Sequence, residues 1–417
     1  MLAAGIDLGT SGCRLVIINQ QADIVHESRL LYPNNITQTP ELWWDTVCHL
    51  FAETPDAIRQ QLASISIDGT SGSLLLCDAN GQPTSPVLMY NDTRATEEAA
   101  MIAKLAPENS GAHGAASSLA KLLYLTNKAT HKQHQHALHQ ADWIANRLLE
   151  QYGLSDENNC LKLGYDSVKQ SWGDWMAKLP FPQRLLPKVQ PVGSCFGTIS
   201  AKQAQTLKLP KNVKIIAGTT DSIAAFIATG AKQLGDAVTS LGSTLVVKIV
   251  SDKPIFAKEM GVYSHRFGKY WLVGGASNSG CAVLLKYFNL LQIKELTNQI
   301  NPKKLLNLGY YPLLKTGERF PIADANKAAI LEPRPASNVE FFQAILEGIA
   351  DIEALAYQTL EHLGAPKPNN ILTVGGGSIN QAWRYIREKK LNLKIKNPYY
   401  SEAAYGSALI ALKGHYK

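Results

Sequence analysis

The sequence predicts an α/β protein made of two related domains, and three observations lead to this fold class. The chain has 417 residues, more than one average domain. Strand-like and helix-like patterns alternate along its N-terminal half. One strand–turn–strand pattern also occurs twice, once in each half. With 45% hydrophobic and 18% charged residues, the composition is that of an ordinary globular protein, which excludes disordered, collagen-like and coiled-coil classes.

Apolar runs separated by turn residues predict that strands dominate the beginning of the chain. Apolar residues at helical spacing predict helices further on, including an apolar one before the middle of the chain. The expected strands are Ala3–Leu8, Arg14–Asn19, Ile24–Leu31, Ile65–Asp68, Leu74–Asp78 and Val87–Tyr90, and the expected helices are Glu41–Glu53, Ser117–Asn127, Trp143–Gln151 and Ser222–Ala228.

The repeated pattern predicts where the chain divides. Residues Ile6–Ile18 form a strand, a turn of small polar residues and a second strand, and Ala237–Ile249 repeat that design. Each half would therefore open with a hairpin and supply helices later. We expect the boundary near Gly230–Gly235, which gives domains at residues 1–230 and 231–417.

The net charge limits the expected binding partners, and the cysteine content limits the expected cellular compartment. The net charge of +7 is spread along the chain rather than gathered in one block, so neither a nucleic acid nor a membrane is an expected partner. The six cysteines include no C-x-x-C pair, which fits neither a disulfide framework nor a zinc site. No basic leader segment and no run long enough to cross a bilayer is visible. We expect a cytoplasmic protein.

Two turns of small and hydroxyl residues are candidate phosphate-binding loops. Asp7 lies inside an apolar strand and is followed by Leu8-Gly9-Thr10-Ser11-Gly12. Gly242-Ser243-Thr244 offers a similar turn in the second half. Backbone N–H groups and hydroxyls in such turns bind anions, and a carboxylate beside them holds Mg²⁺ through water. The alternative is a tight hairpin turn with a capped aspartate. Neither turn is a Walker A loop or a dinucleotide fingerprint.

A third candidate is the glycine-rich turn in Ile371–Trp383. A strand runs into Gly375, Gly376 and Gly377, and a helix follows, for which Ser378 is the expected N-cap. Bare backbone at a helix N-terminus suits a flat ligand, with the glycines and Asn380 as contacts. The alternative is that the glycines only let the helix pack closely on the sheet.

Asp221 is the candidate general base. It lies between a buried strand and an apolar helix, where it could accept the proton of an alcohol that attacks a phosphoryl group. The alternative role is the N-cap of that helix, although Thr219, Thr220 and Ser222 could cap it equally well.

Several polar stretches could hold a polyol, and each has an alternative explanation. They are Asp68–Gly72, Met89–Arg94 and Gly274–Asn278, with Trp43 and Trp44 as possible aromatic platforms. Arg94 could instead pair with Asp92 or Glu97 on a solvated surface. A histidine run between residues 130 and 140 fits either a metal site or a polar surface helix, and its members are His131, His134, His136 and His139.

These motifs together resemble the FGGY family of carbohydrate kinases along nearly the whole chain. Asp7–Arg14 is similar to the family's first phosphate motif and Thr239–Thr244 to the second. Leu372–Trp383 resembles the adenosine motif, and Glu402–Ala408 the closing connecting helix. The resemblance implies an actin-like, ribonuclease H-like ATPase fold with a cleft between two domains. It also implies that ATP, with Mg²⁺, phosphorylates a sugar or polyol hydroxyl.

The resemblance assigns roles to residues of this chain. It puts the sugar site and first phosphate loop in residues 1–230, and the second phosphate loop and adenosine site in 231–417. Asp221 would be the general base and Asp7 the carboxylate that positions Mg²⁺. The residues expected to bind ligands are Asn91, Asp92 and Arg94 for the sugar, Thr10, Ser11, Gly12, Gly242, Ser243 and Thr244 for the phosphates, and Gly376, Gly377 and Asn380 for adenine.

Departures from the family pattern bear on the acceptor. Typical xylulokinases carry Gly-Gln-Met-His-Gly where this chain has Asp68–Gly72, and Tyr90 replaces the usual tryptophan. These segments look like those of the compact D-ribulose kinases of cyanobacteria and plants, with Ser71 and Asp221 in contact with the sugar. We expect a monomeric or homodimeric enzyme that converts D-ribulose to D-ribulose 5-phosphate. The alternatives are D-xylulose or another polyol as acceptor, or a nucleotide-binding sensor of the same fold without kinase turnover.

Overall fold

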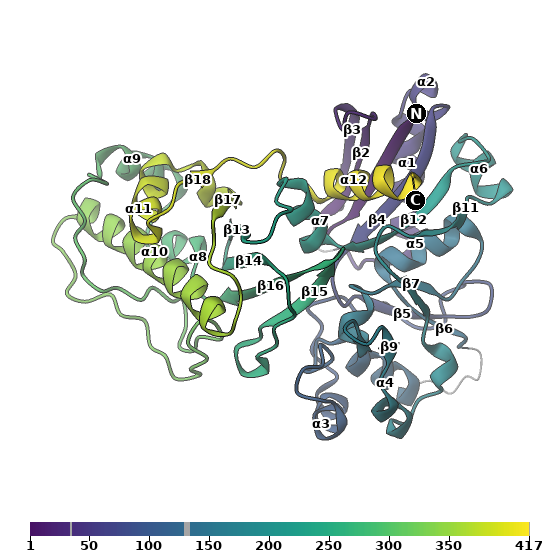
Figure 1. Ribbon diagram of the computed structural model, residues 1–417, viewed down its shortest axis with the longest axis horizontal. Coiled ribbons are helices and arrows are strands. Elements are labelled where there is room, and N and C mark those ends of the chain that lie inside the picture. Colours follow the sequence, from purple (N-terminus) through teal and green to yellow (C-terminus); the bar gives the residue numbers. More distant parts are fainter. Residues whose placement is uncertain (34–35, 129–133, 417) are drawn as a thin grey trace. The chain divides into compact units, whose positions relative to one another are not determined.

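The computed structural model describes residues 1–33, 36–128 and 134–416. Within it the chain forms two compact units, each with its own sheet (Figure 1). Unit 1 comprises Met1–Ala228 together with Glu402–Lys417, and unit 2 comprises Thr229–Ser401. No helix of the described ranges is long and apolar enough to cross a membrane.

The main sheet of unit 1 has six strands in the order β11-β12-β4-β1-β2-β3. β1, β2 and β3 pair antiparallel in the order of the chain. β4 and β12 extend the sheet on the other side of β1 and run parallel to it. β1 is buried along its whole length, including Asp7, whereas β3 alternates between partly buried and exposed residues. The bounds are β1 Leu2–Leu8, β2 Gly12–Ile18, β3 Ile24–Leu31, β4 Leu62–Gly69, β11 Cys195–Thr198 and β12 Lys214–Thr220.

Several helices of unit 1 pack on its main sheet. α1 begins after Thr39, whose hydroxyl accepts from the Leu42 N–H at 3.2 Å, and Pro40 occupies its first turn. The unit contains α1 Pro40–Glu53, α2 Asp56–Arg59, α3 Thr96–Leu105, α4 Ser118–Lys128, α5 Gln140–Leu149, α6 Ala201–Leu207, α7 Asp221–Ala228 and α12 Ala403–His415.

The C-terminal helix α12 packs directly on β1 although hundreds of residues separate them. A Cβ at Gly5 would lie 2.0 Å from the carbonyl oxygen of Ala404, so only glycine allows this approach. The sequence analysis placed this helix with residues 231–417, whereas its contacts place it with unit 1. The boundary near Gly230–Gly235 stays a prediction.

A second layer of unit 1 is formed between residues 70 and 190. β5 pairs with β6 there, and a separate apolar core joins Leu74, Leu122 and Met176. Its short elements are β5 Leu74–Cys77, β6 His136–His139, β7 Leu154–Asp156, β8 Tyr165–Asp166, β9 Ser171–Trp172 and β10 Lys188–Gln190, with 3-10 turns at Cys160–Leu163, Asp174–Lys178 and Gln183–Leu185.

Unit 2 repeats the strand arrangement of unit 1. Its sheet has the order β15-β16-β14-β13-β17-β18, in which β13 is antiparallel to β14 and parallel to β17. β1 has the same relation to β2 and β4, so the sequence repeat corresponds to two hairpins at equivalent places. The bounds are β13 Asp236–Leu241, β14 Leu245–Ser251, β15 Tyr263–Phe267, β16 Tyr270–Ser277, β17 Asn370–Val374 and β18 Ile395–Lys396.

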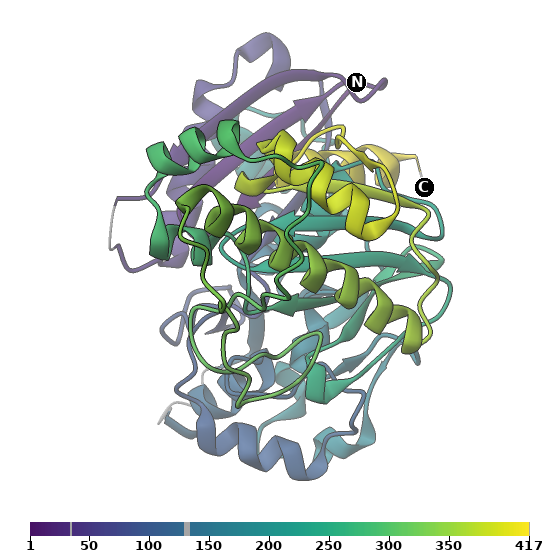
Figure 2. The ribbon, with the colours of Figure 1, turned by 90° about the vertical axis from the view of Figure 1, so that its left-hand side faces the viewer.

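The helices of unit 2 pack around the long helix α10. α10 contacts β14 and β16 of the sheet, and α9 and α11 contact α10 (Figure 2). The helices of this unit are α8 Cys281–Tyr287, α9 Leu290–Gln299, α10 Asn338–His362 and α11 Gln381–Leu391, with 3-10 turns at Lys258–Met260 and Gly376–Ile379.

Most strands and helices expected from the sequence are present, with one exception, and the structure decides between the two explanations of Trp43 and Trp44. Val87–Tyr90 is not a strand, because only Leu88 forms a single bridge, to Leu74. Trp43 and Trp44 are buried in the core of unit 1 and cannot serve as sugar platforms.

A buried ion pair joins helices α10 and α11 to strands β13 and β17 of unit 2. Arg387 on α11 donates through Nε and Nη2 to the carboxylate of Glu353 on α10, at 2.6 and 2.7 Å. Arg387 Nη1 reaches Thr373 on β17 at 3.0 Å, and Thr239 on β13 donates to Glu353 at 2.5 Å. Each charge therefore depends on the other, because burial leaves neither access to water.

We expect Glu353→Gln to lower the free energy of unfolding by about 3–5 kcal/mol, because it leaves the Arg387 charge buried without its counterion. Urea unfolding followed by circular dichroism measures the change. The control is Lys394→Met, which removes the exposed ion pair with Glu388 and should cost less than about 1 kcal/mol. A Glu353→Gln protein as stable as that control would contradict the role of the pair.

Candidate functional site

The register of three parallel strands gathers the candidate acidic residues at one edge of the unit 1 sheet. Asp7 of β1 lies opposite Asp68 of β4, and Asp68 lies opposite Thr219 of β12. Asp221 directly follows β12, and Ser71 lies two residues beyond the end of β4. Because the carboxyl ends of parallel strands share an edge, the candidate metal carboxylate, base and sugar contact all emerge there.

A bulge aims the end of β12. The pairing with β4 shifts between Ile216 and Thr219, and a Cβ at Gly218 would lie 1.8 Å from the carbonyl oxygen of Ile67. Glycine is therefore required at this close approach. The amide of Asn158 then donates to the Thr219 hydroxyl at 3.0 Å and fixes the residues that lead into Asp221.

Asp221 is the first residue of α7 and is partly exposed. Its Oδ1 accepts the Ser222 N–H at 2.6 Å, which orients the carboxylate. A partly exposed, oriented carboxylate can accept a proton from an alcohol.

Asp7 and Asp68 are both buried, and their environments differ. Asp7 forms an ion pair with Arg14 at 3.2 Å, and burial still raises its pKa above the usual value. Oδ2 of Asp68 accepts from Ser407 of α12 at 2.6 Å. Burial and the neighbouring Asp7 raise the pKa of Asp68 well above its usual range.

The carboxylates at this edge fit a cation that is delivered with a nucleotide. No group of three or more histidine, cysteine or acidic side chains in the described ranges is arranged to hold a metal by itself. Oδ1 of Asp68 is buried and has no hydrogen-bond partner among the described residues. Mg²⁺ is commonly held by one or two carboxylates plus substrate phosphates, so this donor set suits it.

Both candidate phosphate turns present hydroxyls to solvent. The first is closed by a Gly9 N–H to Gly12 carbonyl bond of 2.9 Å, and Thr10 and Ser11 are exposed at its tip. The second is closed by a Gly242 N–H to Thr244 carbonyl bond of 3.2 Å, with Ser243 exposed. Each turn can therefore offer hydroxyl donors to an anion.

The glycine-rich turn differs in one detail from the expectation. Helix α11 is capped by Asn380, whose Oδ1 accepts the Trp383 N–H at 2.9 Å, rather than by Ser378. A short 3-10 turn at Gly376–Ile379 comes first, and the hydroxyl of Ser378 bonds back to Gly375 at 2.6 Å. The exposed backbone of Gly375 and Gly376 remains accessible.

The candidate sugar residues lie on two loops of unit 1. Ser71 is partly exposed, and Asn91 is exposed. Arg94 pairs with Asp92 at 2.8 Å, as the alternative explanation of this arginine predicted. The stretch Gly274–Asn278 instead belongs to β16 and the turn after it in unit 2.

Lys121 ties these two loops together, and the sequence analysis missed it. Its buried ammonium donates to the carbonyl oxygens of Gly72 and Met89, at 2.7 Å each. Burial and the nearby Lys162, which reaches the carbonyl of Ser71 at 3.3 Å, lower the pKa of Lys121 to about 8. The only signal in the sequence is a lysine among the apolar residues of α4.

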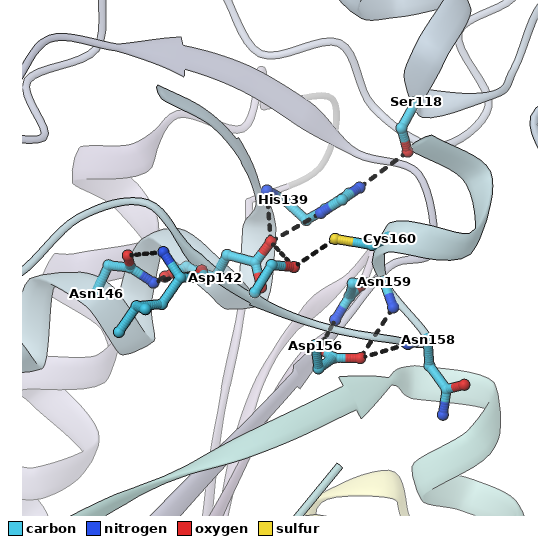
Figure 3. A network of polar contacts seen from close by, with 10 residues as sticks. Ser118, His139, Asp142, Asn146, Asp156, Asn158, Asn159 and Cys160 are labelled. Atoms are coloured by element: carbon cyan, nitrogen blue, oxygen red, sulfur yellow. Dashed lines mark hydrogen bonds and ion pairs between the residues drawn. The ribbon is translucent and has the colours of Figure 1, made fainter. Parts of the chain in front are cut away.

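The histidine run turns out to be partly structural. His139 Nδ1 bonds Asp142 at 2.8 Å, and Nε2 bonds the Ser118 hydroxyl at 3.0 Å (Figure 3). The arrangement resembles a hydrolase triad, but the three side chains are buried and no substrate can reach them. His136–His139 form strand β6 rather than a surface helix, and His134 bonds Thr84 at 2.6 Å. His131 lies outside the described residues.

The same network supports the bulged end of β12. Asp156 accepts the backbone N–H groups of Asn158 and Asn159, at 2.9 Å each (Figure 3). Burial and the nearby Asp142 raise the pKa of Asp156 to about 8. Because Asn158 also bonds Thr219, this cluster holds the strand that leads to Asp221.

Comparison with known families identifies this chain. The model of the N-terminal domain of the FGGY family of carbohydrate kinases matches residues 2–228, and that of the C-terminal domain matches residues 237–414. The chain belongs to the FGGY family of carbohydrate kinases. It is therefore a phosphotransferase, and the alternative of a nucleotide sensor without turnover falls away.

Individual relatives are distant but cover the chain. A xylulose kinase of Staphylococcus xylosus is 22% identical and covers 98% of this chain and 90% of its own length. A xylulose kinase of Escherichia coli is 23% identical over 92% of this chain and 83% of its own length. A gluconokinase of Bacillus subtilis is 21% identical over 98% and 86%.

Solved structures confirm the expected fold. The crystal structure of a xyloylose kinase from Brucella ovis matches with a TM-score of 0.88 and 23% identity, covering 100% of this chain and 91% of the other. A gluconate kinase from Lactobacillus acidophilus matches with a TM-score of 0.85 and 20% identity, covering 99% and 89%. The actin-like, ribonuclease H-like ATPase fold predicted from the sequence is confirmed.

We expect Lys121→Met to raise the KM for the sugar about tenfold, equivalent to about 1.4 kcal/mol, and to leave the KM for ATP within twofold. The methionine keeps an apolar stem and removes the donors that hold the carbonyls of Gly72 and Met89. Steady-state kinetics with each substrate varied in turn measures both constants.

The matched control is Lys214→Met. Lys214 also donates to a backbone carbonyl, that of His415 at 3.0 Å, but it lies at the end of β12 opposite to Asp221. A folded Lys121→Met enzyme with the sugar KM of the control would show that the tie does not support sugar binding.

Proposed function

We propose that this kinase transfers the γ-phosphoryl group of ATP to the terminal hydroxyl of a ketopentose, foremost D-ribulose, to give D-ribulose 5-phosphate. The observation that carries the proposal is the shared sheet edge, where Asp7, Asp221 and the loop with Ser71 emerge from adjacent parallel strands. Its cytoplasmic location and its state as a monomer or homodimer stay predictions from the sequence.

In this proposal the acceptor is handled by unit 1. Ser71, Asn91, Asp92 and Arg94 hold the sugar hydroxyls. Asp221 accepts the proton of the attacking hydroxyl, and the Ser222 N–H keeps its carboxylate in orientation. The ammonium of Lys121 keeps the two sugar loops in place from behind.

The nucleotide would be held by polar turns of both units. Thr10, Ser11 and Gly12, and separately Gly242, Ser243 and Thr244, would bind phosphates through N–H groups and hydroxyls. Gly376, Gly377 and Asn380 would lie against adenine. Bound Mg²⁺–ATP supplies the phosphoryl group and neutralises phosphate charge, and Asp7 would hold the cation.

D-xylulose is the second candidate acceptor. The relatives from Staphylococcus xylosus and Escherichia coli are both named xylulose kinase. Against it stand the replacement of the Gly-Gln-Met-His-Gly motif by Asp68–Gly72 and the presence of Tyr90.

The proposed acceptor can be tested with a panel of sugars and polyols. With Mg²⁺ and ATP, we expect ADP release to be fastest with D-ribulose among D-ribulose, D-xylulose, L-ribulose, ribitol, glycerol and a blank without sugar. A coupled assay gives kcat/KM for each. Faster turnover with D-xylulose would replace the proposed substrate and keep the kinase.

The proposed base can be tested by one substitution. We expect Asp221→Asn to lower kcat about 10²- to 10⁴-fold, because the amide keeps the shape and cannot accept the proton. The matched control is Asp166→Asn on the hairpin of β8, where the carboxylate also accepts backbone N–H groups, at 2.9 and 3.0 Å. If Asp221→Asn retains the kcat of the control, Asp221 is not the base.

A further inference from the structure

A continuous chain of hydrogen bonds runs behind the acceptor loop to the first phosphate turn. Gln140, the first residue of α5, accepts at Oε1 from the N–H and hydroxyl of Thr70, at 3.0 and 2.7 Å. Its Nε2 donates to Oε1 of Gln38 at 3.2 Å. Gln38 Nε2 in turn donates to the carbonyl oxygen of Thr10 at 2.8 Å.

The orientation of both amides follows from their neighbours. The indole N–H of Trp43, which can only donate, bonds Oε1 of Gln38 at 2.8 Å. The amide nitrogen of Gln38 must then face Thr10. The backbone N–H of Thr70 likewise requires the oxygen of Gln140, so its nitrogen must face Gln38. Neither amide can flip without breaking two bonds.

The chain also extends towards the second sugar loop. The hydroxyl proton of Thr70 is committed to Gln140, so the bond of 2.6 Å between Thr70 and Ser73 is donated by Ser73. Oγ of Ser73 accepts the Tyr90 N–H at 2.9 Å. Donors therefore point in one direction from Tyr90 to Thr10, an arrangement in which successive bonds strengthen one another.

Burial makes this chain costly to break. Gln140 is fully buried, Thr70 is 3% exposed and Gln38 is 8% exposed. A buried amide that loses a partner finds no water to replace it, so each broken bond costs free energy. A movement of the Thr70 loop is therefore transmitted to the Thr10 turn, because both are bonded to this chain. Neither glutamine belongs to the proposed ligand contacts.

We propose that Gln140 is a positioning residue for phosphoryl transfer, which couples the acceptor loop Thr70–Ser73 to the phosphate turn at Thr10. Sugar bound at Ser71 orders the acceptor loop, and the Gln140–Gln38 chain holds the Thr10 turn in the geometry that binds phosphate. The sugar therefore tightens nucleotide binding and favours transfer over hydrolysis. This inference rests on the proposed function, because it takes Ser71 and Thr10 as ligand contacts.

The experiment measures coupling at equilibrium. Isothermal titration calorimetry gives the Kd of Mg²⁺–ADP with and without saturating D-ribulose. We expect the sugar to lower this Kd at least fivefold in the natural protein and less than twofold in Gln140→Met. We also expect the ratio of sugar-independent ATP hydrolysis to sugar phosphorylation to rise about tenfold in Gln140→Met.

A second variant separates coupling from simple loss of structure. Gln140→Glu keeps an oxygen for Thr70 and places the other carboxylate oxygen against Oε1 of Gln38, so the loop contact survives and the link is lost. We expect its sugar KM to stay within threefold of the natural protein while coupling disappears.

The matched control is Gln343→Met in unit 2. Gln343 is also a buried glutamine that accepts from a backbone N–H, of Asn301 at 3.1 Å, and donates to a carbonyl, of Lys304 at 2.7 Å. Its replacement should leave coupling intact.

The outcomes separate this inference from the proposed function. If both Gln140 variants retain the coupling, the inference is wrong. It is also wrong if the natural protein shows no coupling with an acceptor that it phosphorylates. Neither result would contradict the assignment of the protein as a kinase. If the substrate panel selects another sugar, the same titration with that sugar decides the inference, and only the proposed acceptor is lost.

Discussion

The register of β1 against β4, and of β4 against β12, is the constraint on which the candidate site depends. Asp7 meets Asp68, and Asp68 meets Thr219, because three strands far apart in the sequence end at the same edge. A slip by one residue would turn each of these side chains to the opposite face of the sheet. The bulge at Gly218 and the close approach of α12 at Gly5 both fix strands of this edge. The geometry of the site therefore depends on the packing of unit 1.

The two hairpins of the repeat have diverged in charge. The last paired residues before the turns are Leu8 in β1 and Leu241 in β13, so Asp7 corresponds to Ser240. A buried carboxylate costs free energy that Arg14 only partly offsets, and such a cost persists at functional sites. Unit 2 has Ser240 at the equivalent position. Its buried Arg387–Glu353 pair instead links strands to helices. The carboxylate that we propose to hold Mg²⁺ is thus present in only one copy of the hairpin.

Local patterns in the sequence were sufficient for the hairpins, the buried strands and the family. They were insufficient wherever a contact between residues far apart in the sequence determines the role of a side chain. Trp43 and Trp44 could be platforms or core residues, and only the packing of α1 on the sheet makes them core. Ser378 and Asn380 are both good N-caps, and a 3-10 turn, which the pattern does not encode, selects Asn380. Gln38 and Gln140 lie about a hundred residues apart in the sequence and become neighbours only through the fold.

The residues missed by the sequence share a position behind the acceptor loops rather than in them. Lys121 holds the backbone at Gly72 and Met89, and Gln140 holds Thr70, so the main chain of both loops is fixed by groups that need not touch the sugar. A backbone fixed in this way lets side chains that face the ligand change without moving the loop. In the proposed site the choice of acceptor then rests on a few accessible positions, which include Ser71, Tyr90, Asn91 and Arg94 in this chain. Replacement of these side chains should change the acceptor, whereas replacement of Lys121 should weaken every acceptor alike.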